Sequence, residues 1–403
     1  MLSTTLTDEE RDQLHETYRH LHRNPELSMQ EHRTAEFIER RLDEIGIEHF
    51  RCGGTGVVGI HRNGDGPVVG FRADSDGLPI QEDTGADYAS TATGELADGT
   101  TVPVMHGCGH DTHVSSALAT AALMARQTDG WSGTIVWLFQ PGEETAAGAA
   151  AMVADGLWDR APKPEVVFGQ HVFPSVPSGS IAVSRGTAMA LADSLRVTVF
   201  GTQSHGSQPQ NAIDPIVLGA HMVTRLQTIV SRELSPQEPA VVTCGTFHAG
   251  LKENIIPDRA EFTLNIRTLT EESRNRVLPA ITRIVNAEAE ASAAPQPQIE
   301  EIYRFPRLYN DPERTEQVIA ALRAELGDDR IVEVPPAMGS EDFGWLADSI
   351  GVPCVFWFFG GFAAENTAPP VNHSPFFLPD MEPTLSTAVR AGVATLQRAL
   401  ERG

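Results

Sequence analysis

The chain contains, at residues 105–113, the stretch Met105-His106-Gly107-Cys108-Gly109-His110-Asp111-Thr112-His113, which gathers a thiol and imidazoles around glycines. Further along, an apolar run ends in Gln140-Pro141-Gly142-Glu143-Glu144, with adjacent carboxylates. Packing alone does not account for so many metal-binding side chains at such close spacing. Together the two stretches indicate most of a metal site with one carboxylate left over to move protons, which is typical of a metallohydrolase.

The segments around these two stretches alternate between strand and helix patterns. Apolar runs of the kind that form buried strands are separated by segments with helical spacing of apolar residues. A capping start at Thr7 and a stop at Gly46 bound a helical N-terminal region. This alternation predicts an α/β layer with a largely parallel sheet. We expect buried strands at residues 68–71, 134–139, 166–168 and 353–358, and helices at 115–126, 146–155 and 385–400.

A different pattern begins at about residue 190. An alternating strand is expected at 194–200, and Asp214-Pro215 then opens a helix, with Asp as the N-cap and Pro in the first turn. Strands at 241–247 and 261–267 and a helix at 271–291 follow. These elements are enough for a compact α+β unit. The simplest architecture is therefore one α/β domain interrupted by a small inserted domain.

Composition excludes several classes of partner. The chain has 403 residues with 30 basic and 54 acidic side chains, and its formal net charge of −24 argues against nucleic acids and anionic membranes as partners. No apolar run approaches the ~18 residues of a membrane span, and the N-terminus lacks the pattern of a signal peptide. The four cysteines lie far apart and predict no disulfide framework. We therefore expect a cytoplasmic protein.

Cys108 and His110 are the first candidate metal ligands. Because they are two residues apart, they would point to the same side of an extended segment at a glycine-flanked strand end. The alternative is a buried structural cysteine beside a hydrogen-bonded histidine. His106 and His113 are expected to serve in packing or in orienting other side chains.

Glu143 and Glu144 are the candidate carboxylates. They follow a buried strand through a Pro-Gly turn, and open α/β sheets place their sites beyond the carboxyl ends of strands. Adjacent carboxylates on a solvated turn are common, and alone they would indicate nothing more. Beside the cysteine and histidine cluster they divide into a metal ligand and a general base.

Two separate histidines complete the candidate set. His171 follows a predicted strand and His373 lies near the C-terminus, although each alone is more often structural. Asp74 and Asp76 also end a strand, and one of them is expected to orient a ligand imidazole, with a helix-capping turn as the alternative. With the cysteine, histidine and glutamate above, the two histidines give five donors, which is enough for two metals with open positions.

Short motifs occur in order along nearly the whole chain, at His22-Arg23-Asn24-Pro25-Glu26-Leu27, residues 71–81, 105–113 and 139–144, Gln170-His171, Asn254-Ile255-Ile256-Pro257, Gly339-Ser340-Glu341-Asp342-Phe343 and His373-Ser374-Pro375. In these motifs the chain resembles the M20 metallopeptidase clan. Within the clan it is most similar to the amidohydrolase branch, which includes hippurate hydrolases, auxin-conjugate hydrolases and N-acyl-amino-acid aminoacylases. So many motifs in one order make the resemblance specific.

The resemblance implies a fold and a cofactor. It implies a catalytic domain of residues 1–187 and 306–403 with a largely parallel sheet. The inserted α+β domain, residues 188–305, would act as a lid and mediate homodimer formation. The cofactor would be two divalent metal ions, of Zn, Mn, Co or Ni. The implied ligands are Cys108, His110, Glu144, His171 and His373.

The same resemblance assigns roles outside the ligand set. Glu143 would be the general acid and base. Asp76 would orient the metal ligands without binding metal itself. In the lid, His205 would reach a neighbouring site and help to hold the tetrahedral oxyanion. Asn254 and Arg267 would meet the carbonyl or carboxylate of the substrate. The departures from the usual pattern, none of which removes a proposed ligand, are Ser75, Gly77, Ser204 and Gln210.

The expected reaction is metal-assisted hydrolysis of small N-acyl amino acids to a carboxylic acid and a free amino acid. A metal can lower the pKa of water from 15.7 to roughly 7, and Glu143 would carry the water proton to the leaving amine. The first alternative is a dipeptidase or carboxypeptidase of the same clan. A thiol nucleophile at Cys108 is a second, although it would leave the glutamates and distant histidines idle. A non-catalytic ligand-binding protein on an enzyme fold is the third.

Overall fold

The computed structural model describes residues 2–401, which form two compact units. Unit 1 takes in the chain up to Ala188, then Tyr309–Pro335 and the chain from Asp342 onward. Unit 2 consists of Met189–Leu308 and Pro336–Glu341. Each unit has a sheet and a hydrophobic core of its own, and the chain enters unit 2 twice and returns each time to unit 1.

Unit 1 is built on a ten-stranded mixed sheet with the order β1-β2-β6-β3-β7-β18-β16-β9, to which β8 and β17 are attached. The central strands run parallel, with β3 between β6 and β7 and with β18 beside β7. Their apolar runs are buried on both faces, as parallel strands require. The predicted α/β fold with a largely parallel sheet is confirmed. The main strands are β1 Glu48–Cys52, β2 Gly56–Asn63, β3 Val68–Asp74, β6 Gly133–Gln140, β7 Val166–Pro177, β8 Ile181–Val183, β9 Gly186–Met189, β16 Leu308–Asn310, β17 Ile331–Glu333 and β18 Cys354–Phe362, and a separate hairpin pairs β4 Thr93–Glu95 with β5 Thr101–Pro103.

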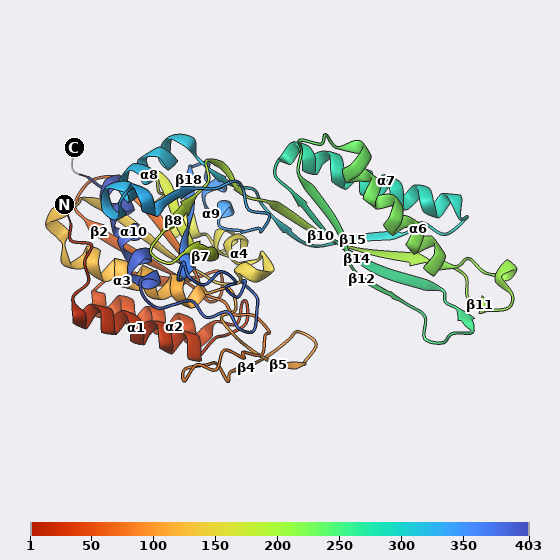
Figure 1. Cartoon of the computed structure of the whole chain (residues 1–403), viewed down its shortest axis with the longest axis horizontal. Coiled ribbons are helices and arrows are strands. Elements are labelled where there is room, and N and C mark those ends of the chain that lie inside the picture. The colour runs from red at the N-terminus through yellow and green to blue at the C-terminus, as the bar shows by residue number, and fades with distance from the viewer. Residues whose placement is uncertain (1, 402–403) are drawn as a thin grey trace. The chain divides into compact units, whose positions relative to one another are not determined.

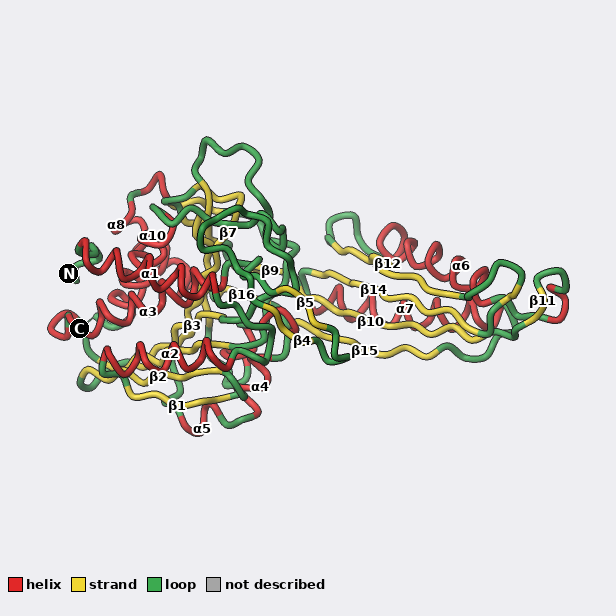
Figure 2. The backbone as a smooth tube through the Cα atoms, turned by 90° about the horizontal axis from the view of Figure 1, so that it is seen from below, coloured by secondary structure: helices red, strands yellow, loops and turns green. Residues whose placement is uncertain are grey.

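Capping residues mark the ends of several helices in unit 1. Thr7 and Glu10 form a reciprocal capping box at the start of α1, and Gly46 ends α2 in the left-handed conformation. α3 and α10 pack on the central strands, where Gln170 of β7 donates to Ser116 and to the carbonyl of Ala388. Figure 2 shows α1, α3 and α10 lying together beside these strands. The helices are α1 Asp8–Arg23, α2 His32–Ile45, α3 His110–Arg126, α4 Gly148–Ala154, α5 Leu157–Arg160, α8 Pro312–Leu326, α9 Gly344–Asp348 and α10 Thr384–Ala399.

Unit 2 is a single antiparallel sheet with helices on one face (Figure 1). Its order is β12-β14-β10-β15, and a two-stranded ribbon of β11 and β13 extends from it. Asp214 caps α6 with Pro215 in the first turn, as predicted, whereas β15 was not foreseen from the sequence. In the described part of the chain no helix is both long enough and apolar enough to cross a membrane. The elements are β10 Leu191–Phe200, β11 Ser204–His205, α6 Pro215–Thr228, a π-helical turn Ile229–Glu233, β12 Ala240–Ala249, β13 Ile255–Ile256, β14 Arg259–Thr268, α7 Glu271–Ala291 and β15 Gln298–Phe305.

Candidate metal centre

Several residues of the candidate site lie at or just beyond the ends of parallel strands in unit 1. β3 ends at Asp74, and β6 ends at Gln140 immediately before the turn that carries Glu143 and Glu144. β7 carries His171 within the strand, opposite Phe358 of β18, so the expectation that this histidine follows the strand is wrong. The carboxyl ends of parallel strands meet at one edge of the sheet, which explains why residues so far apart in sequence converge.

Cys108 and His110 do not lie in an extended segment, and that prediction is wrong. Gly109 adopts φ +85°, and α3 begins at His110 directly after it. A Cβ on Gly109 would lie 2.4 Å from Val172 Cγ1, so this turn requires glycine. The turn sends the two donors to different partners. Cys108 Sγ lies 3.5 Å from His171 Nε2, while His110 Nε2 lies 3.9 Å from Glu144 Oε1.

The five predicted donors form one continuous cluster. His373 Nε2 lies 3.3 Å from Glu144 Oε1, and ligand atoms of Cys108, Glu144 and His373 all lie within 4.8 Å of one another. His373 adopts φ +67°, and its N–H donates to the carbonyl of Gly107 at 2.7 Å, which holds the histidine against the Cys108 turn. The imidazole of His373 is half-exposed, whereas the other four donors are buried or nearly so, which leaves the cluster open on that side.

Hydrogen bonds fix which nitrogen of each buried histidine faces the cluster. His171 Nδ1 donates to the carbonyl of Val172 at 2.7 Å, which leaves the Nε2 lone pair toward Cys108. His110 Nδ1 lies 3.1 Å from Asp76 Oδ1, which directs Nε2 toward Glu144. The other oxygen of Asp76 accepts from the Glu144 N–H at 3.1 Å. Asp76 therefore orients one candidate ligand by its ring and another by its backbone.

His113 lies beside the cluster but has no nitrogen left for a metal. Asp74, His110, His113 and His171 are close enough to hold an ion. However, His113 Nε2 accepts the Val172 N–H at 2.9 Å, so Nδ1 carries the proton and donates to Asp74. Arg72 Nη1 also donates to Asp74, at 2.8 Å. The Asp74–His113 pair therefore supports the middle of β7 beside His171, through the Val172 N–H.

The charges of the cluster favour a cation. Burial raises the pKa of Cys108 well above its usual value, and the negative charges of Glu144, Glu143 and Asp74 raise it further. Burial alone would lower the pKa of His110, but the charge of Asp74 and the hydrogen bond and charge of Asp76 outweigh it and raise the pKa to about 10. Positive charge is thus held by protons where no metal is bound, and metal binding displaces them.

Two polar atoms in the cluster make no well-oriented hydrogen bond within residues 2–401, although each has a charged neighbour at 3.3–3.4 Å. They are His110 Nε2 and Glu144 Oε1, both buried, and they belong to one group with Glu143. Buried polar atoms without a hydrogen bond are rare in proteins. A divalent cation would satisfy both, and thiolate, imidazole and carboxylate are the donors that zinc and related metals accept. The residues therefore fit the metal site that the sequence implies.

In unit 2, His205 and Asn254 lie together at one end of the sheet. His205 pairs with Ile255 in the β11–β13 ribbon, and the Gly206 N–H donates to the carbonyl of Asn254 at 2.8 Å. His205 Nδ1 accepts the Ser207 N–H at 3.1 Å, so Nε2 carries the proton and is the outward donor. An exposed imidazole N–H of this kind suits an oxyanion.

Arg267 stands at the opposite end of β14. Its Nε donates to Asn265 Oδ1 at 2.8 Å and its Nη1 to Ser340 Oγ at 2.7 Å, so the guanidinium is held in place. Arg259, at the end of β14 near the β11–β13 ribbon, is eight residues away, which corresponds to about 26 Å at ~3.3 Å per residue. Unit 2 therefore does not bring His205 and Arg267 together.

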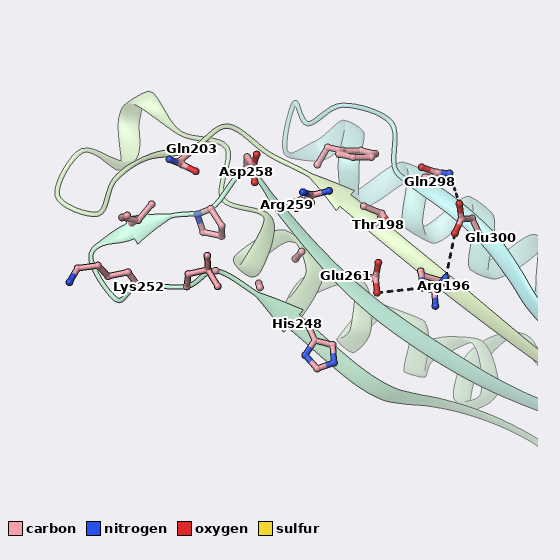
Figure 3. Close-up of a pocket in the computed structure, with 17 residues that line it drawn as sticks. Arg196, Thr198, Gln203, His248, Lys252, Asp258, Arg259, Glu261, Gln298 and Glu300 are labelled. Atoms are coloured by element: carbon pink, nitrogen blue, oxygen red, sulfur yellow. Dashed lines mark hydrogen bonds and ion pairs between the residues drawn. The ribbon is translucent and has the colours of Figure 1, made fainter. Parts of the chain in front are cut away.

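A hollow of about 860 Å³ opens on the uncovered face of the unit 2 sheet (Figure 3). Arg196 lies within it between Glu261 and Glu300, at 3.4 and 3.7 Å. Gln203 and Ile255 also line it, so it adjoins the ribbon that carries His205. Arg267 shares this face of the sheet, because alternate residues of β14 are buried beneath the helices.

Sequence reasoning assigned no role to three buried residues that support the cluster from unit 1. His22 is fully buried between Asp111 Oδ2 at 2.7 Å and Glu82 Oε1 at 3.0 Å. Asp111 follows His110 in the first turn of α3, so this network fixes the start of that helix. The signal was present in the sequence, since His22 begins a motif and Asp111 lies within the 105–113 stretch.

Comparison with known proteins gives a consistent picture. Residues 70–401 match the model of peptidase family M20/M25/M40. Thermostable carboxypeptidase 2 of Saccharolobus solfataricus is 35% identical over 90% of this chain and 89% of its own length, and the hippurate hydrolase of Campylobacter jejuni is 36% identical over 83% and 85%. The crystal structure of the Bacillus subtilis YXEP protein, described as a dinuclear metal-binding peptidase of the M20 family, aligns with a TM-score of 0.78 at 31% identity over 97% and 99%.

Proposed function

The chain belongs to peptidase family M20/M25/M40, and on that premise we propose that it is a metal-dependent amidohydrolase that cleaves N-acyl amino acids to a carboxylic acid and a free amino acid. One observation carries the proposal. A buried cluster of thiol, imidazole and carboxylate donors lies beside Glu143, a carboxylate of the same group that the proposed ligand set leaves unused. That combination is the one that metal-assisted hydrolysis uses.

Two divalent ions would be held by Cys108, His110, Glu144, His171 and His373. Glu144 is the donor shared between the Cys108–His373 side and the His110 side, because its Oε1 lies near both. When bound, the metals polarise the amide carbonyl and acidify a water molecule. Zinc, manganese, cobalt and nickel all suit this mixed donor set.

The remaining chemistry falls to side chains of the chain itself. Glu143 accepts the proton of the attacking water at its carboxylate and delivers it to the nitrogen of the leaving amine. The outward N–H of His205 donates to the oxyanion that develops on the carbonyl oxygen. Arg267 pairs with the free carboxylate of the amino-acid half, and Asn254 donates to the substrate from the same lid.

We place these lid residues in a homodimer formed through unit 2. In one copy about 26 Å of sheet separates the ends that carry His205 and Arg267, which is more than a small substrate can span. Both can serve one substrate if they come from two copies. Unit 2 offers a surface for this association. β12 is an edge strand, and Val241, Phe247, Ile216 and Val217 on β12 and α6 are exposed.

The proposed location is the cytoplasm. All four cysteines are free thiols, which suits a reducing compartment. The net charge of −24 leaves nucleic acids and anionic membranes disfavoured as partners. The partners are therefore a small N-acyl amino acid and a second copy of the chain.

A carboxypeptidase activity is the second candidate, since two relatives carry that name. Both reactions cleave an amide and release an amino acid with a free carboxylate, so the same residues serve either. The amidohydrolase interpretation is favoured by the relative named hippurate hydrolase, at similar identity. Hydrolysis rates for benzoyl-glycine, acyl-glutamine and plain dipeptides separate the two candidates.

The roles of the adjacent glutamates provide the decisive experiment. In metal-reconstituted protein, Glu143→Gln should lower kcat by about 10²–10⁴-fold with the metal content unchanged, because only the proton carrier is lost. Glu144→Gln is the matched control, and it should lose metal as well as activity. Metal content is measured by elemental analysis and amino-acid release by chromatography. Equal metal loss in both variants, or full activity of Glu143→Gln, contradicts the assignment.

A further inference from the structure

The loop between α1 and α2, residues 24–31, reaches into the metal centre from outside the ligand set. Its last residue, Glu31, is completely buried, although a carboxylate is costly to bury. Burial and the negative charge of Asp76 raise the pKa of Glu31 to about 7, so the site bears an electrostatic cost for this side chain. An uncharged residue would avoid that cost, which points to a task for the carboxylate.

Glu31 joins three segments through its oxygens. Oε1 accepts the N–H groups of Met29 and Gly142, both at 2.8 Å, and Oε2 accepts from Thr55 Oγ1 at 2.5 Å. Gly142 is the residue immediately before Glu143 and Glu144. The carboxylate therefore grips the backbone at the first residue of the turn that carries the proposed base and a proposed ligand.

The geometry around Gly142 leaves the turn little freedom. Gly142 has φ +56°, and a Cβ there would lie 2.5 Å from Met29 Sδ, so the loop packs directly against it. The carbonyl of Gly142 accepts the N–H groups of Ala147 and Gly148 at 3.2 and 3.1 Å. With its N–H held by Glu31 and its carbonyl by the start of α4, the position of Gly142 sets where Glu143 and Glu144 begin.

The same loop also contacts Asp76, the second residue that holds the Glu143–Glu144 turn. Ser28 Oγ donates to Asp76 Oδ2 at 2.7 Å, and this oxygen also accepts the Glu144 N–H. Glu144 is therefore restrained from both sides, through Gly142 by Glu31 and through Asp76 by Ser28. Met29 is held at φ +62°, a left-handed conformation that is unusual for this residue type, by its own bond to Glu31.

We propose that Glu31 is a positioning residue of the metal centre, which fixes the Glu143–Glu144 turn through the Gly142 N–H. It touches neither substrate nor metal and acts through the turn alone. Its effect on metal affinity depends only on the ligand role of Glu144. Its effect on turnover rests on the proposed function.

The test uses the full-length protein and Co²⁺ alone as the probe. Co²⁺ titration is followed by the absorption of the Cys108 thiolate complex, well below the melting temperature of each variant. Glu31→Ala removes the acceptor, and Glu31→Asp keeps the charge but shortens the side chain. Both should weaken Co²⁺ binding by about 10–100-fold, the range typical of partners behind metal ligands. Glu31→Gln should keep most of the wild-type Co²⁺ affinity, since its amide oxygen still accepts the N–H groups of Met29 and Gly142.

Thr55→Val is the matched control. It removes the hydroxyl from the other oxygen of Glu31 but leaves the bond to Gly142, so it should lower the melting temperature without weakening Co²⁺ binding. Under saturating metal, Glu31→Ala and Glu31→Asp should lower kcat more than they raise KM. If Glu31→Ala and Glu31→Asp both keep the wild-type Co²⁺ affinity and kcat, the positioning role is contradicted and Glu31 is purely structural. If the wild type hydrolyses no substrate but the variants bind Co²⁺ weakly, the proposed function fails and the positioning role stands.

Discussion

The metal cluster of unit 1 and the lid residues of unit 2 are held in opposite ways. In unit 1 the candidate ligands His110 and His171 are buried, and each has a second hydrogen bond that aims it. In unit 2, His205 and Asn254 stand exposed on a short ribbon, tied to the sheet only through local bonds. The first region is complete without any further surface, whereas the second presents donors with nothing to bind in its own unit.

This difference in burial shows which site residues are oriented by folding and which stay solvated until they bind a ligand. Burial in unit 1 has already removed water from the ligands, so folding itself fixes their orientation before any metal binds. Exposed donors in unit 2 keep their water until a substrate or a second surface arrives. We therefore expect changes at the metal ligands of unit 1 to remove metal and activity together, and changes at the donors of unit 2 to lower turnover with the metal content unchanged.

Removing the metals should give the largest effect. A chelator should abolish hydrolysis completely, and added Zn²⁺, Mn²⁺ or Co²⁺ should restore it, because the ligands remain aimed by their own hydrogen bonds. Amino-acid release is measured before and after metal addition. Full activity in the presence of the chelator would support a thiol nucleophile at Cys108 instead.

His205→Ala should lower kcat by about 10²–10³-fold, as expected for the loss of one oxyanion donor, and leave the metal content unchanged. Mixing this variant with Glu143→Gln sharpens the comparison, because each chain supplies what the other lacks. Recovery of activity in mixed dimers would place His205 in the site of the other copy. Two inactive variants that stay inactive when co-assembled would contradict the dimer arrangement.

The pH dependence of stability should report the buried network of unit 1. Burial opposes the charge on His22, but hydrogen bonds to Asp111 and Glu82 outweigh it and raise the pKa from 6.5 to about 9. Because the pKa is raised in the folded state, the stabilisation is full below pH 6.5 and is lost as the pH rises through 9. The free energy of unfolding should fall by roughly 3 kcal/mol across this range.

Denaturant unfolding of the wild type and of His22→Gln at pH 6 and pH 10 measures this difference. The variant should lack the His22 part of the slope, so the two stabilities converge at high pH. Parallel curves for the two proteins would mean that His22 is neutral in the folded state.

The exposed ion pairs of Arg196 in unit 2 should give the smallest effect on stability. Arg196 lies between Glu261 and Glu300 with every partner well exposed, and such pairs contribute less than about 1 kcal/mol. Arg196→Gln should therefore change the free energy of unfolding by no more than this, and less at high salt. A larger loss would show that the hollow on this sheet face is an organised part of the protein.

Most of the fold could be predicted from local pattern. Thr7, Gly46 and Asp214-Pro215 mark helix ends by chemistry that acts within a few residues, so the structure has these ends where the sequence places them. The strand β15 was missed because it is polar and largely exposed, and its alternation carries no apolar signal. Pairing with β10, which no local pattern encodes, is what makes it a strand.

The site could be predicted as a set of residues but not as a geometry. Cys108 and His110 suggested an extended segment by their spacing, yet Gly109 turns the chain and starts a helix there. Glu31 escaped notice because its partner Gly142 lies 111 residues away, and a lone glutamate before a helix resembles any solvated residue. Which carboxylate is buried, and against what, is decided by tertiary contacts alone.

The division of unit 1 into separate stretches of chain has a consequence for its synthesis on the ribosome. β18 lies inside the sheet, between β7 and β16, and His373 follows it, whereas the whole stretch from Met189 to Leu308 is made earlier. At ~5–20 residues per second, the ribosome adds His373 about 10–40 s after Ala188. Unit 2 can fold during this interval, while the nascent metal centre still lacks its last donor. Ribosome-arrested chains that end before β18 should resist protease in unit 2 and remain cleavable in unit 1.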